Sequence, residues 1–346
     1  MTFDDFDVLD WTTQKVGAPA SWPEPGDSGE LDDGTRVEFW DYGVFALTPA
    51  QPGSKDVILS CAIHGNETAP IEMVRDMLHD IFSGKLQLRQ RTLFLIGNPQ
   101  AIMIGKRFVD YNMNRLFSGA HKSGDTPEHK RAADIESYVT KFYNEAPADG
   151  KRQRLHYDLH TAIRDSAYEK FAVYPFTHGG PYKKEQLTFL AECGVTTILL
   201  NQAPTTTFSY YSVRSHGADA FTVELGKVRP FGENDMSRFA DADRMFRKLI
   251  SQDQLDLPAF DATRHTIFDV YRTINRTQQG FRLNFPGDVA NFTEFEQGYL
   301  LAVDESVEYH VEQPGERIIF PNADVAIGQR ALLTVVELPL DQLELV

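Results

Sequence analysis

Residues 57–70 read V-I-L-S-C-A-I-H-G-N-E-T-A-P, and this stretch indicates the fold of the chain most clearly. The first seven residues are apolar or small and include β-branched members, a pattern typical of a buried strand. His64-Gly65-Asn66-Glu67 follows at once, and apolar residues recur at helical spacing from Ile71 onward. We therefore predict a strand, a tight loop that carries His64 and Glu67, and a helix.

The His64 and Glu67 pair is a candidate for binding a metal. Three positions apart on a loop, an imidazole nitrogen and a carboxylate oxygen can meet at one cation such as zinc. The pair alone is weak evidence, because His and Glu at this spacing share one face of any surface helix. Glu67 would also be favourable near a helix N-terminus without binding a metal.

Two later predicted strands end in groups of the same chemistry. The first, residues 154–159, leads to His160, and the second contains Glu224. If both lie parallel to the first strand, their carboxyl ends meet at one sheet edge, where open α/β folds bind ligands. His160 then completes the two-His-one-Glu set of a catalytic zinc, Asp158 holds a ligand imidazole, and Glu224 transfers protons. The alternatives are a hydrogen-bonded histidine at a strand end and a glutamate that pairs with a nearby cation.

The chain is acidic, with a formal net charge of −16 over 346 residues. Nucleic acids and anionic membranes would repel it, so we expect neither as a partner. An anionic substrate requires basic residues gathered locally, and Lys106, Arg107 and Arg115 form such a cluster, although a solvated basic loop is the alternative. We expect a small-molecule substrate with several carboxylates, and whether the chain forms a homo-oligomer is left open.

The N-terminus and the cysteines indicate the compartment. The first residues are acidic and lack the pattern of a signal peptide. No run reaches the roughly 18 apolar residues that a membrane helix needs. Cys61 and Cys193 lie in apolar surroundings, where we expect free thiols in a reducing compartment. We therefore expect a cytoplasmic protein.

The order of patterns along the chain predicts an α/β fold in two domains. Strand and helix patterns alternate through most of the chain, which indicates a mostly parallel sheet. From about His265 the helical periodicity stops, and short strands separated by Pro, Gly, Asn and Asp predict a small all-β domain. We predict a catalytic domain over residues 1–258, with a loosely structured lead-in at residues 1–35, and a β-rich C-terminal domain over residues 259–346.

Five short motifs carry a family resemblance. They are H-G-N-E at 64–67, N-P-Q-A at 98–101, K-R-F-V-D-Y-N-M-N-R at 106–115, D-L-H-T-A-I-R at 158–164 and T-V-E-L-G-K at 222–227. Together they resemble the aspartoacylase and succinylglutamate desuccinylase family of zinc amidohydrolases, and the likeness runs from about residue 38 to the C-terminus. It implies a zinc-carboxypeptidase-like, three-layer domain with a mostly parallel mixed sheet, followed by a β-rich domain that helps cover the active site.

The resemblance also implies roles for single residues. His64, Glu67 and His160 match the ligands of one Zn²⁺ per chain. Glu224 matches the catalytic glutamate, and Arg107 matches the arginine that polarises the scissile carbonyl. The residues that match positions holding substrate carboxylates, or are further candidates for that role, are Asn114, Arg115, Arg164, Tyr210, Arg214 and Lys227.

The reaction that the resemblance implies is hydrolysis of the amide of N-succinyl-L-glutamate to succinate and L-glutamate, the last step of the arginine succinyltransferase route of arginine degradation. Two alternatives stay open: a deacylase of another N-acyl amino acid such as N-acetylaspartate, and a metal- or ligand-binding protein without turnover. Two positions depart from the family pattern. Asn112 stands where a carboxylate usually orients the arginines, and Asp165 replaces a small residue near Arg164.

Overall fold

A large mixed β-sheet forms the centre of the molecule. The structure is a computed structural model that describes residues 5–147 and 152–346. The strands of the large sheet are β1 (Ser28–Glu30), β2 (Arg36–Asp41), β3 (Val44–Thr48), β4 (Lys55–Cys61), β5 (Arg91–Ile96), β6 (Gln153–Ala162), β7 (Phe171–Tyr174), β8 (Thr197–Leu200), β9 (Asp219–Lys227), β10 (Thr266–Asn275), β12 (Thr293–Glu294), β15 (Arg317–Ile319) and β16 (Arg330–Glu337). Over the described residues these 13 strands lie in the order β1-β2-β3-β5-β4-β6-β9-β7-β8-β10-β16-β15-β12.

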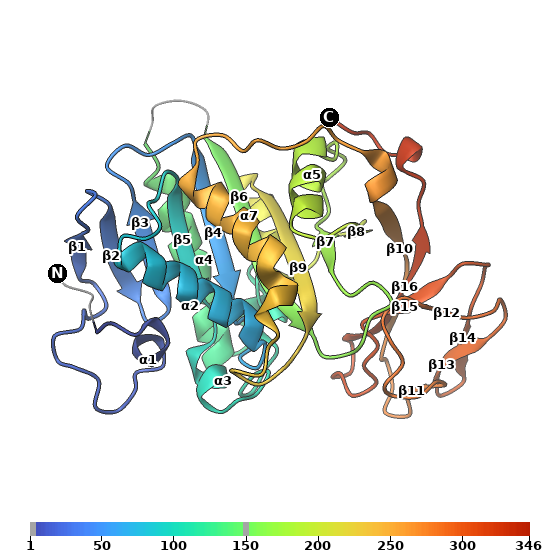
Figure 1. Cartoon of the computed structure of the whole chain (residues 1–346). Coiled ribbons are helices and arrows are strands. Elements are labelled where there is room, and N and C mark those ends of the chain that lie inside the picture. The colour runs from blue at the N-terminus through green and yellow to red at the C-terminus, as the bar shows by residue number, and fades with distance from the viewer. Residues whose placement is uncertain (1–4, 148–151) are drawn as a thin grey trace.

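Helices cover both faces of this sheet, which makes the three layers that the resemblance implies. The helices are α1 (Val8–Thr12), α2 (Thr68–Phe82), α3 (Pro99–Met103), α4 (Pro127–Asn144), α5 (Lys184–Glu192), α6 (Phe208–His216) and α7 (Ala240–Ser251). Figure 1 shows α2 and α7 in front of the sheet and α4 behind it. Apolar residues of α2, α5 and α7 form one core cluster with the sheet, and those of α4 and α6 form another. Alternate residues of β4 join the two clusters, so this strand is buried on both faces.

The condition for a shared site is met, because β4, β6 and β9 are parallel neighbours. Ser60 of β4 lies opposite Asp158 of β6, and His160 of β6 lies opposite Glu224 of β9. The carboxyl ends of the three strands therefore reach the same edge of the sheet. The sheet is mixed rather than uniformly parallel, since β7 runs antiparallel to β9.

The prediction of a loosely structured lead-in over residues 1–35 is wrong for part of that stretch, although residues 1–4 lie outside the described chain. Asp7 caps α1 by accepting a hydrogen bond from the Asp10 backbone N–H at 2.7 Å. Phe6, Val8 and Trp11 are buried in the main core. Apolar side chains embedded in an acidic, Gly- and Pro-rich segment bury enough surface to order it, which the composition alone conceals.

The C-terminal part is all-β as predicted, but its strands are not confined to a sheet of their own. β10 pairs parallel with β8, and β16, β15 and β12 extend the large sheet. A second sheet holds β11 (Arg282–Leu283), β13 (Leu300–Asp304) and β14 (Val307–His310). The backbone hydrogen bonds between β8 and β10 therefore join the two predicted domains. The division between residues 258 and 259 stays a prediction.

Two further observations concern the cysteines and the apolar character of the helices. Cys61 and Cys193 are buried free thiols, as expected. Burial raises the pKa of both thiols. Among the described helices, none combines the length and the apolar character that crossing a membrane requires.

Candidate metal and catalytic site

The loop after β4 is held in an unusual backbone conformation. Ala62 has a φ of 55°, a region that side chains other than glycine seldom occupy. Its carbonyl accepts a hydrogen bond from the Asn98 backbone N–H at 2.8 Å, which fixes the turn. Glu67 then stands at the N-cap position of α2. The turn directs His64 and Glu67 towards the end of β6.

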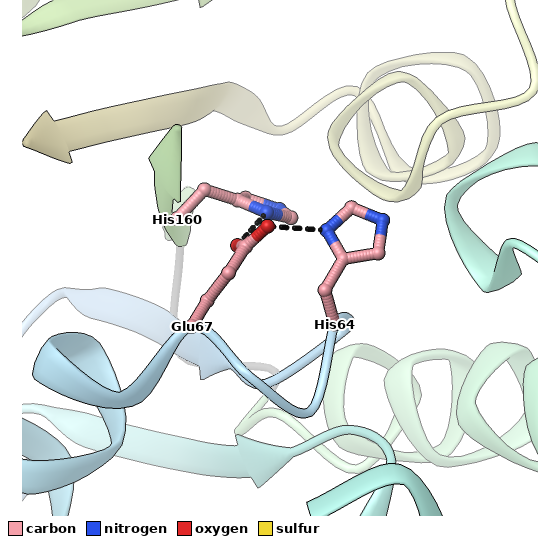
Figure 2. Close-up of side chains that lie close together, drawn as sticks. All are labelled: His64, Glu67 and His160. Atoms are coloured by element: carbon pink, nitrogen blue, oxygen red, sulfur yellow. Dashed lines mark hydrogen bonds and ion pairs between the residues drawn. The ribbon is translucent and has the colours of Figure 1, made fainter. Parts of the chain in front are cut away.

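His64, Glu67 and His160 converge as predicted (Figure 2). One ligand atom from each lies within 4.8 Å of the other two, and all three side chains are buried. Glu67 Oε1 lies 2.8 Å from His64 Nδ1, and Glu67 Oε2 lies 2.8 Å from His160 Nδ1. Two imidazole nitrogens and one carboxylate around a common point are the donor set that zinc favours. These residues could hold a metal ion.

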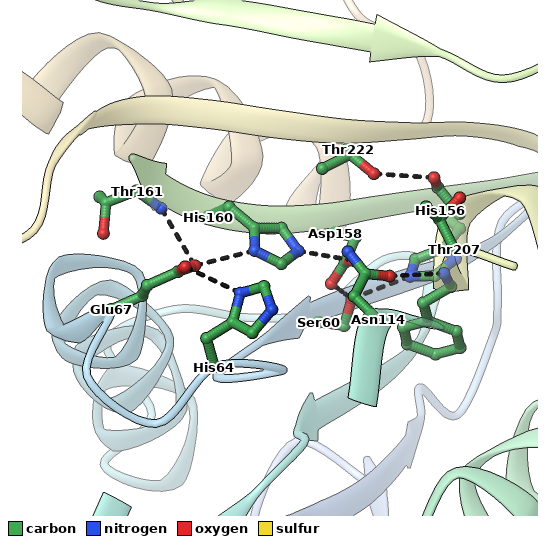
Figure 3. Close-up of polar contacts among 12 residues, drawn as sticks. Ser60, His64, Glu67, Asn114, His156, Asp158, His160, Thr161, Thr207 and Thr222 are labelled. Atoms are coloured by element: carbon green, nitrogen blue, oxygen red, sulfur yellow. Dashed lines mark hydrogen bonds and ion pairs between the residues drawn. The ribbon is translucent and has the colours of Figure 1, made fainter. Parts of the chain in front are cut away.

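Each histidine turns its Nδ1 towards Glu67, and each Nε2 has another partner; Figure 3 draws that of His160, which is Asp158. Asp158 Oδ2 lies 2.8 Å from His160 Nε2, and Asn112 Oδ1 lies 2.9 Å from His64 Nε2. Both partner atoms accept hydrogen bonds, so each Nε2 carries the hydrogen and each Nδ1 can bind a cation. The role expected of Asp158 is therefore consistent with its position. The Asn112 side chain contacts a metal-site histidine, while its backbone carbonyl accepts a hydrogen bond from the Arg115 N–H at 3.0 Å.

The charges around the three residues favour a metal-binding state at His64. Burial and the positive charge of Arg107 lower the pKa of His64 to about 4, so this imidazole is neutral at physiological pH. Burial opposes the charged form of His160, but Asp158 and Glu67 outweigh it and raise its pKa. Without a cation, His160 therefore takes a proton and pairs with Glu67.

Asp158 is hydrogen-bonded on its other oxygen to a chain of buried polar groups (Figure 3). Ser60 donates a hydrogen bond to Asp158 Oδ1 at 2.6 Å, and its hydroxyl lies 2.8 Å from His156 Nε2. His156 Nδ1 lies 2.8 Å from the Ser212 hydroxyl. All four groups are buried, so the network fixes the orientation of His160 through Asp158. The alternation of β6 places His156, Asp158 and His160 on one face.

Glu224 lies beside this site without a partner for one oxygen. It is 8% exposed, and its Oε2 makes no hydrogen bond within the described structure. Burial raises the pKa of Glu224 to about 7, since the nearby His160 opposes that shift only in part. A carboxyl group that exchanges its proton near neutral pH, with a free oxygen, suits a general base.

Arg107 reaches the site from a loop that packs on the metal loop. Its Nη1 donates to Glu67 Oε1 at 2.6 Å, and its carbonyl accepts from the Gly65 N–H at 3.1 Å. The loop is anchored by Glu128 of α4, which accepts hydrogen bonds from three successive backbone N–H groups, those of Val109, Asp110 and Tyr111. Sequence analysis missed Glu128, because a glutamate in the first turn of a helix is ordinary in composition.

Asn114 and Arg115 lie in a short 3₁₀ turn next to that loop. The Asn114 side-chain oxygen accepts from the Phe208 N–H at 2.9 Å, which ties this turn to the start of α6. Arg115 donates from Nη1 to the Asn114 carbonyl at 2.9 Å. Removal from solvent and the charge of Arg107 lower the pKa of Arg115 to about 10. Arg115 therefore lies within electrostatic reach of the site.

The remaining predicted substrate residues are more scattered. Arg164 is half-buried and its Nη1 has no partner in the described structure. The Tyr210 hydroxyl lies 3.2 Å from His178 Nε2, and the exposed Arg214 donates to the Ser118 carbonyl at 3.3 Å. No hydrogen bond in the described chain joins either Tyr210 or Arg214 to the three metal-site residues.

A cavity of about 570 Å³ opens beyond the ends of β6 and β9. Its lining includes Ala162 and Arg164, which follow His160, and Lys227, which follows Glu224 by three positions. Lys227 donates to Asp165 at 2.7 Å, so the unusual acid at position 165 neutralises a candidate cation. This space is lined by both signs of charge, and its lining does not include the three metal-site residues or Glu224.

Gly65→Ala is expected to weaken metal binding. A Cβ at this position would lie 2.3 Å from the Ala101 carbonyl carbon and 2.4 Å from the Ile102 nitrogen, so the loop must move. We expect zinc affinity to fall roughly 10- to 100-fold, as when a partner of a metal ligand is lost. Competition with a chromophoric chelator measures this. Gly287→Ala, where a Cβ meets nothing within 4 Å, is the matched control. Parental affinity in Gly65→Ala would contradict the prediction.

Comparison with known proteins agrees with this geometry. The family model described as "Succinylglutamate desuccinylase/Aspartoacylase catalytic domain" matches residues 53–250, and the "AstE/AspA barrel-sandwich hybrid domain" matches residues 263–338. A succinylglutamate desuccinylase of Idiomarina loihiensis is 60% identical over 343 residues, which cover 98% of each chain. That of Shewanella frigidimarina is 52% identical over 89% of this chain and 90% of its own.

Solved structures extend the comparison to the fold. The succinylglutamate desuccinylase of Chromobacterium violaceum superposes with a TM-score of 0.84 at 39% identity, covering 96% of this chain and 98% of its own. Murine aminoacylase 3 shares the fold at 17% identity, with a TM-score of 0.57, covering 84% of this chain and 97% of its own. The family that the sequence motifs resemble is thus confirmed: the chain belongs to the succinylglutamate desuccinylase/aspartoacylase family.

Proposed function

We propose that the protein is a zinc-dependent amidohydrolase that converts N-succinyl-L-glutamate into succinate and L-glutamate. The observation that carries the proposal is the convergence of His64, Glu67 and His160 beside Glu224, a buried carboxyl group with an unpartnered oxygen. The substrate is inferred from relatives that are 50–60% identical over most of the chain and are named succinylglutamate desuccinylases.

Zinc fits the residues that are present. Two neutral-capable imidazoles and one carboxylate converge, and Asp158 and Asn112 hold the two histidines with Nδ1 facing inward. When bound by His64, Glu67 and His160, one zinc ion would supply Lewis acidity for the amide carbonyl and for the attacking water. A set of three protein ligands is typical of catalytic rather than structural zinc.

Glu224 moves the proton. Its free Oε2 accepts a proton from the water that attacks the acyl carbon, and the carboxyl group then gives that proton to the leaving nitrogen of glutamate. In the metal-free site burial raises the pKa of Glu224 to about 7, so this carboxylate is a stronger base than an exposed glutamate.

Arg107 stabilises the charge that develops on the carbonyl oxygen. One of its five N–H groups donates to Glu67, and its side chain is 29% exposed, so further donors are available to a substrate. A well-placed donor of this kind contributes about 3 to 4 kcal/mol to the transition state. Arg107 approaches Glu67 from the loop on one side, while Glu224 lies on β9.

The substrate carries three carboxylates, which must be met by cations in a chain whose net charge is −16. Arg115, with Asn114 beside it, and Arg164, with its unpartnered Nη1, are the candidates that we propose. Arg214 and Lys227 are already bonded to Ser118 and Asp165, respectively. The family resemblance further supports a place in arginine degradation, in the cytoplasm.

Release of L-glutamate from N-succinyl-L-glutamate by metal-depleted protein, with and without added zinc, tests the proposal. We expect release that depends on zinc, with little activity on N-acetylaspartate, because a site built to pair an acyl carboxylate loses binding when that group is missing. No release with zinc verifiably bound would reject the substrate. Faster hydrolysis of N-acetylaspartate would favour the alternative deacylase, and binding without turnover of any acyl amino acid would favour a binding protein.

A further inference from the structure

Arg330, at the start of β16, lies beside the predicted site although it belongs to the C-terminal part of the chain. The preceding residue, Gln329, donates a side-chain hydrogen bond to the Tyr111 hydroxyl. Tyr111 is in the loop that carries Arg107 and Asn112, so this contact joins the C-terminal strands to the loop at the metal site. Sequence analysis missed Arg330, because more than 200 residues separate it from that loop.

A series of ring contacts leads from Arg330 to the strand of Glu224. The guanidinium of Arg330 lies 5.3 Å from the centre of the Phe320 ring. Phe320 in turn packs on Phe171, with ring centres 5.8 Å apart. Phe171 is the register partner of Glu224 in the pairing of β7 with β9. Arg330 therefore follows a residue that is bonded to Tyr111, and its own guanidinium packs on an aromatic pair that reaches the register partner of Glu224.

Arg330 and Arg115 are cations without counter-ions. Arg330 Nε is buried and has no hydrogen-bond partner, and no carboxylate in the described residues forms an ion pair with either arginine. Arg115 makes its hydrogen bond to a backbone carbonyl. Arg330 directly follows Gln329, whose side chain bonds to Tyr111, and Arg115 lies four residues after Tyr111, so the two arginines belong to segments that are in contact. Removal from solvent and the charge of Arg115 lower the pKa of Arg330, which agrees with this arrangement. Two close, partly desolvated cations are unfavourable unless an anion binds between them.

We infer that Arg330 and Arg115 together bind one carboxylate of the substrate. This inference rests on the proposed function and extends it to a residue of the C-terminal part. A planar guanidinium offers paired donors that match a carboxylate, and the stack on Phe320 holds its plane in place. The C-terminal strands would thus take part in specificity as well as in covering the site.

Arg330→Gln tests the inference with four substrates. They are N-succinyl-L-glutamate and three analogues that each lack one carboxylate: N-butyryl-L-glutamate, N-succinyl-L-norvaline and N-succinyl-4-aminobutyrate. We expect kcat/KM to fall roughly 10- to 100-fold for the full substrate, since a hydrogen-bonded charge pair is lost. The loss should persist with two analogues and disappear with the third, and that third analogue identifies the carboxylate that Arg330 binds.

Controls separate binding from folding. Arg330→Lys keeps the charge and should recover part of the activity, while Arg282→Gln alters an exposed arginine of β11 and should change none of the four rates. An equal loss on all four substrates, or no loss on the full substrate, would overturn this inference but leave the proposed function standing. If the unsubstituted enzyme fails to hydrolyse N-succinyl-L-glutamate, the proposed function is wrong and the inference falls with it.

Discussion

Glu224→Gln is expected to abolish turnover while leaving zinc binding intact. The amide has nearly the same shape as the carboxyl group but cannot accept a proton from water, so kcat should fall roughly 10²- to 10⁴-fold. Glu224 is not one of the three convergent ligands, so zinc content should remain at one ion per chain. Glutamate release and metal content, measured on the same preparation, check both parts.

Two further observations make this result specific to the proton transfer. Glu337→Gln alters an exposed glutamate at the end of β16 and should leave kcat unchanged. Glu224→Gln should also stabilise the metal-free protein. Because burial raises the pKa of Glu224 from 4.5 to about 7, its ionised form destabilises the fold.

The size of this stability effect depends on pH. Below about pH 4.5 the carboxyl group is protonated in both folded and unfolded chains, so the substitution should have little effect. Between pH 4.5 and 7 the penalty grows, and above pH 7 it is complete, on the order of 3 kcal/mol. Urea unfolding at pH 5 and pH 8 measures the difference. A Glu224→Gln variant with near-parental kcat would refute the catalytic role.

His160→Gln is expected to remove both zinc and activity. His160 is one of three convergent ligands, and it also lies between two buried carboxylates, those of Glu67 and Asp158. Losing an outer partner of a ligand typically costs 10- to 100-fold in affinity, so losing the ligand itself should cost more than about 100-fold. Without the Lewis acid, kcat/KM should fall by about 10³-fold or more. Chelator competition and glutamate release measure the two effects.

A matched histidine substitution controls for general damage. His310, on β14 and far along the chain from the site, has a side chain that is 44% exposed, and His310→Gln should retain zinc and turnover. Thermal unfolding would show whether His160→Gln remains folded after Glu67 and Asp158 lose their shared partner. A folded His160→Gln protein that keeps stoichiometric zinc and parental activity would exclude His160 as a ligand.

The local sequence was enough to predict the central strands and the metal-site residues. β4 and β9 are buried on both faces and contain short apolar runs close to a polar group, whereas β6 alternates apolar residues with His156, Asp158 and His160. Once they are assumed to be parallel neighbours, the convergence of His64, Glu67 and His160 follows from the shared direction of the strands. The proton-transfer role of Glu224 follows from its place on the neighbouring strand, whereas the role of Arg107 could be assigned only through the family resemblance.

Residues that act through long-range contacts could not be found in this way. Glu128 anchors the Arg107 loop through backbone N–H groups, and Asn112 orients His64, and neither interaction has a periodic pattern in the sequence. The same holds for the exposed position of Arg214, which its spacing from Tyr210 does not disclose.

The sequence by itself determined the alternating α/β core, the metal-site motif and the acidic character of the chain, because these depend on local periodicity and residue type. Only the tertiary structure decided that the C-terminal strands continue the large sheet and bring the Gln329-Arg330 segment to Tyr111, in the loop before Arg115. The physical reason is that strand pairing and charge proximity depend on how distant segments pack, and the free energy of that packing is spread over many contacts that no short motif records.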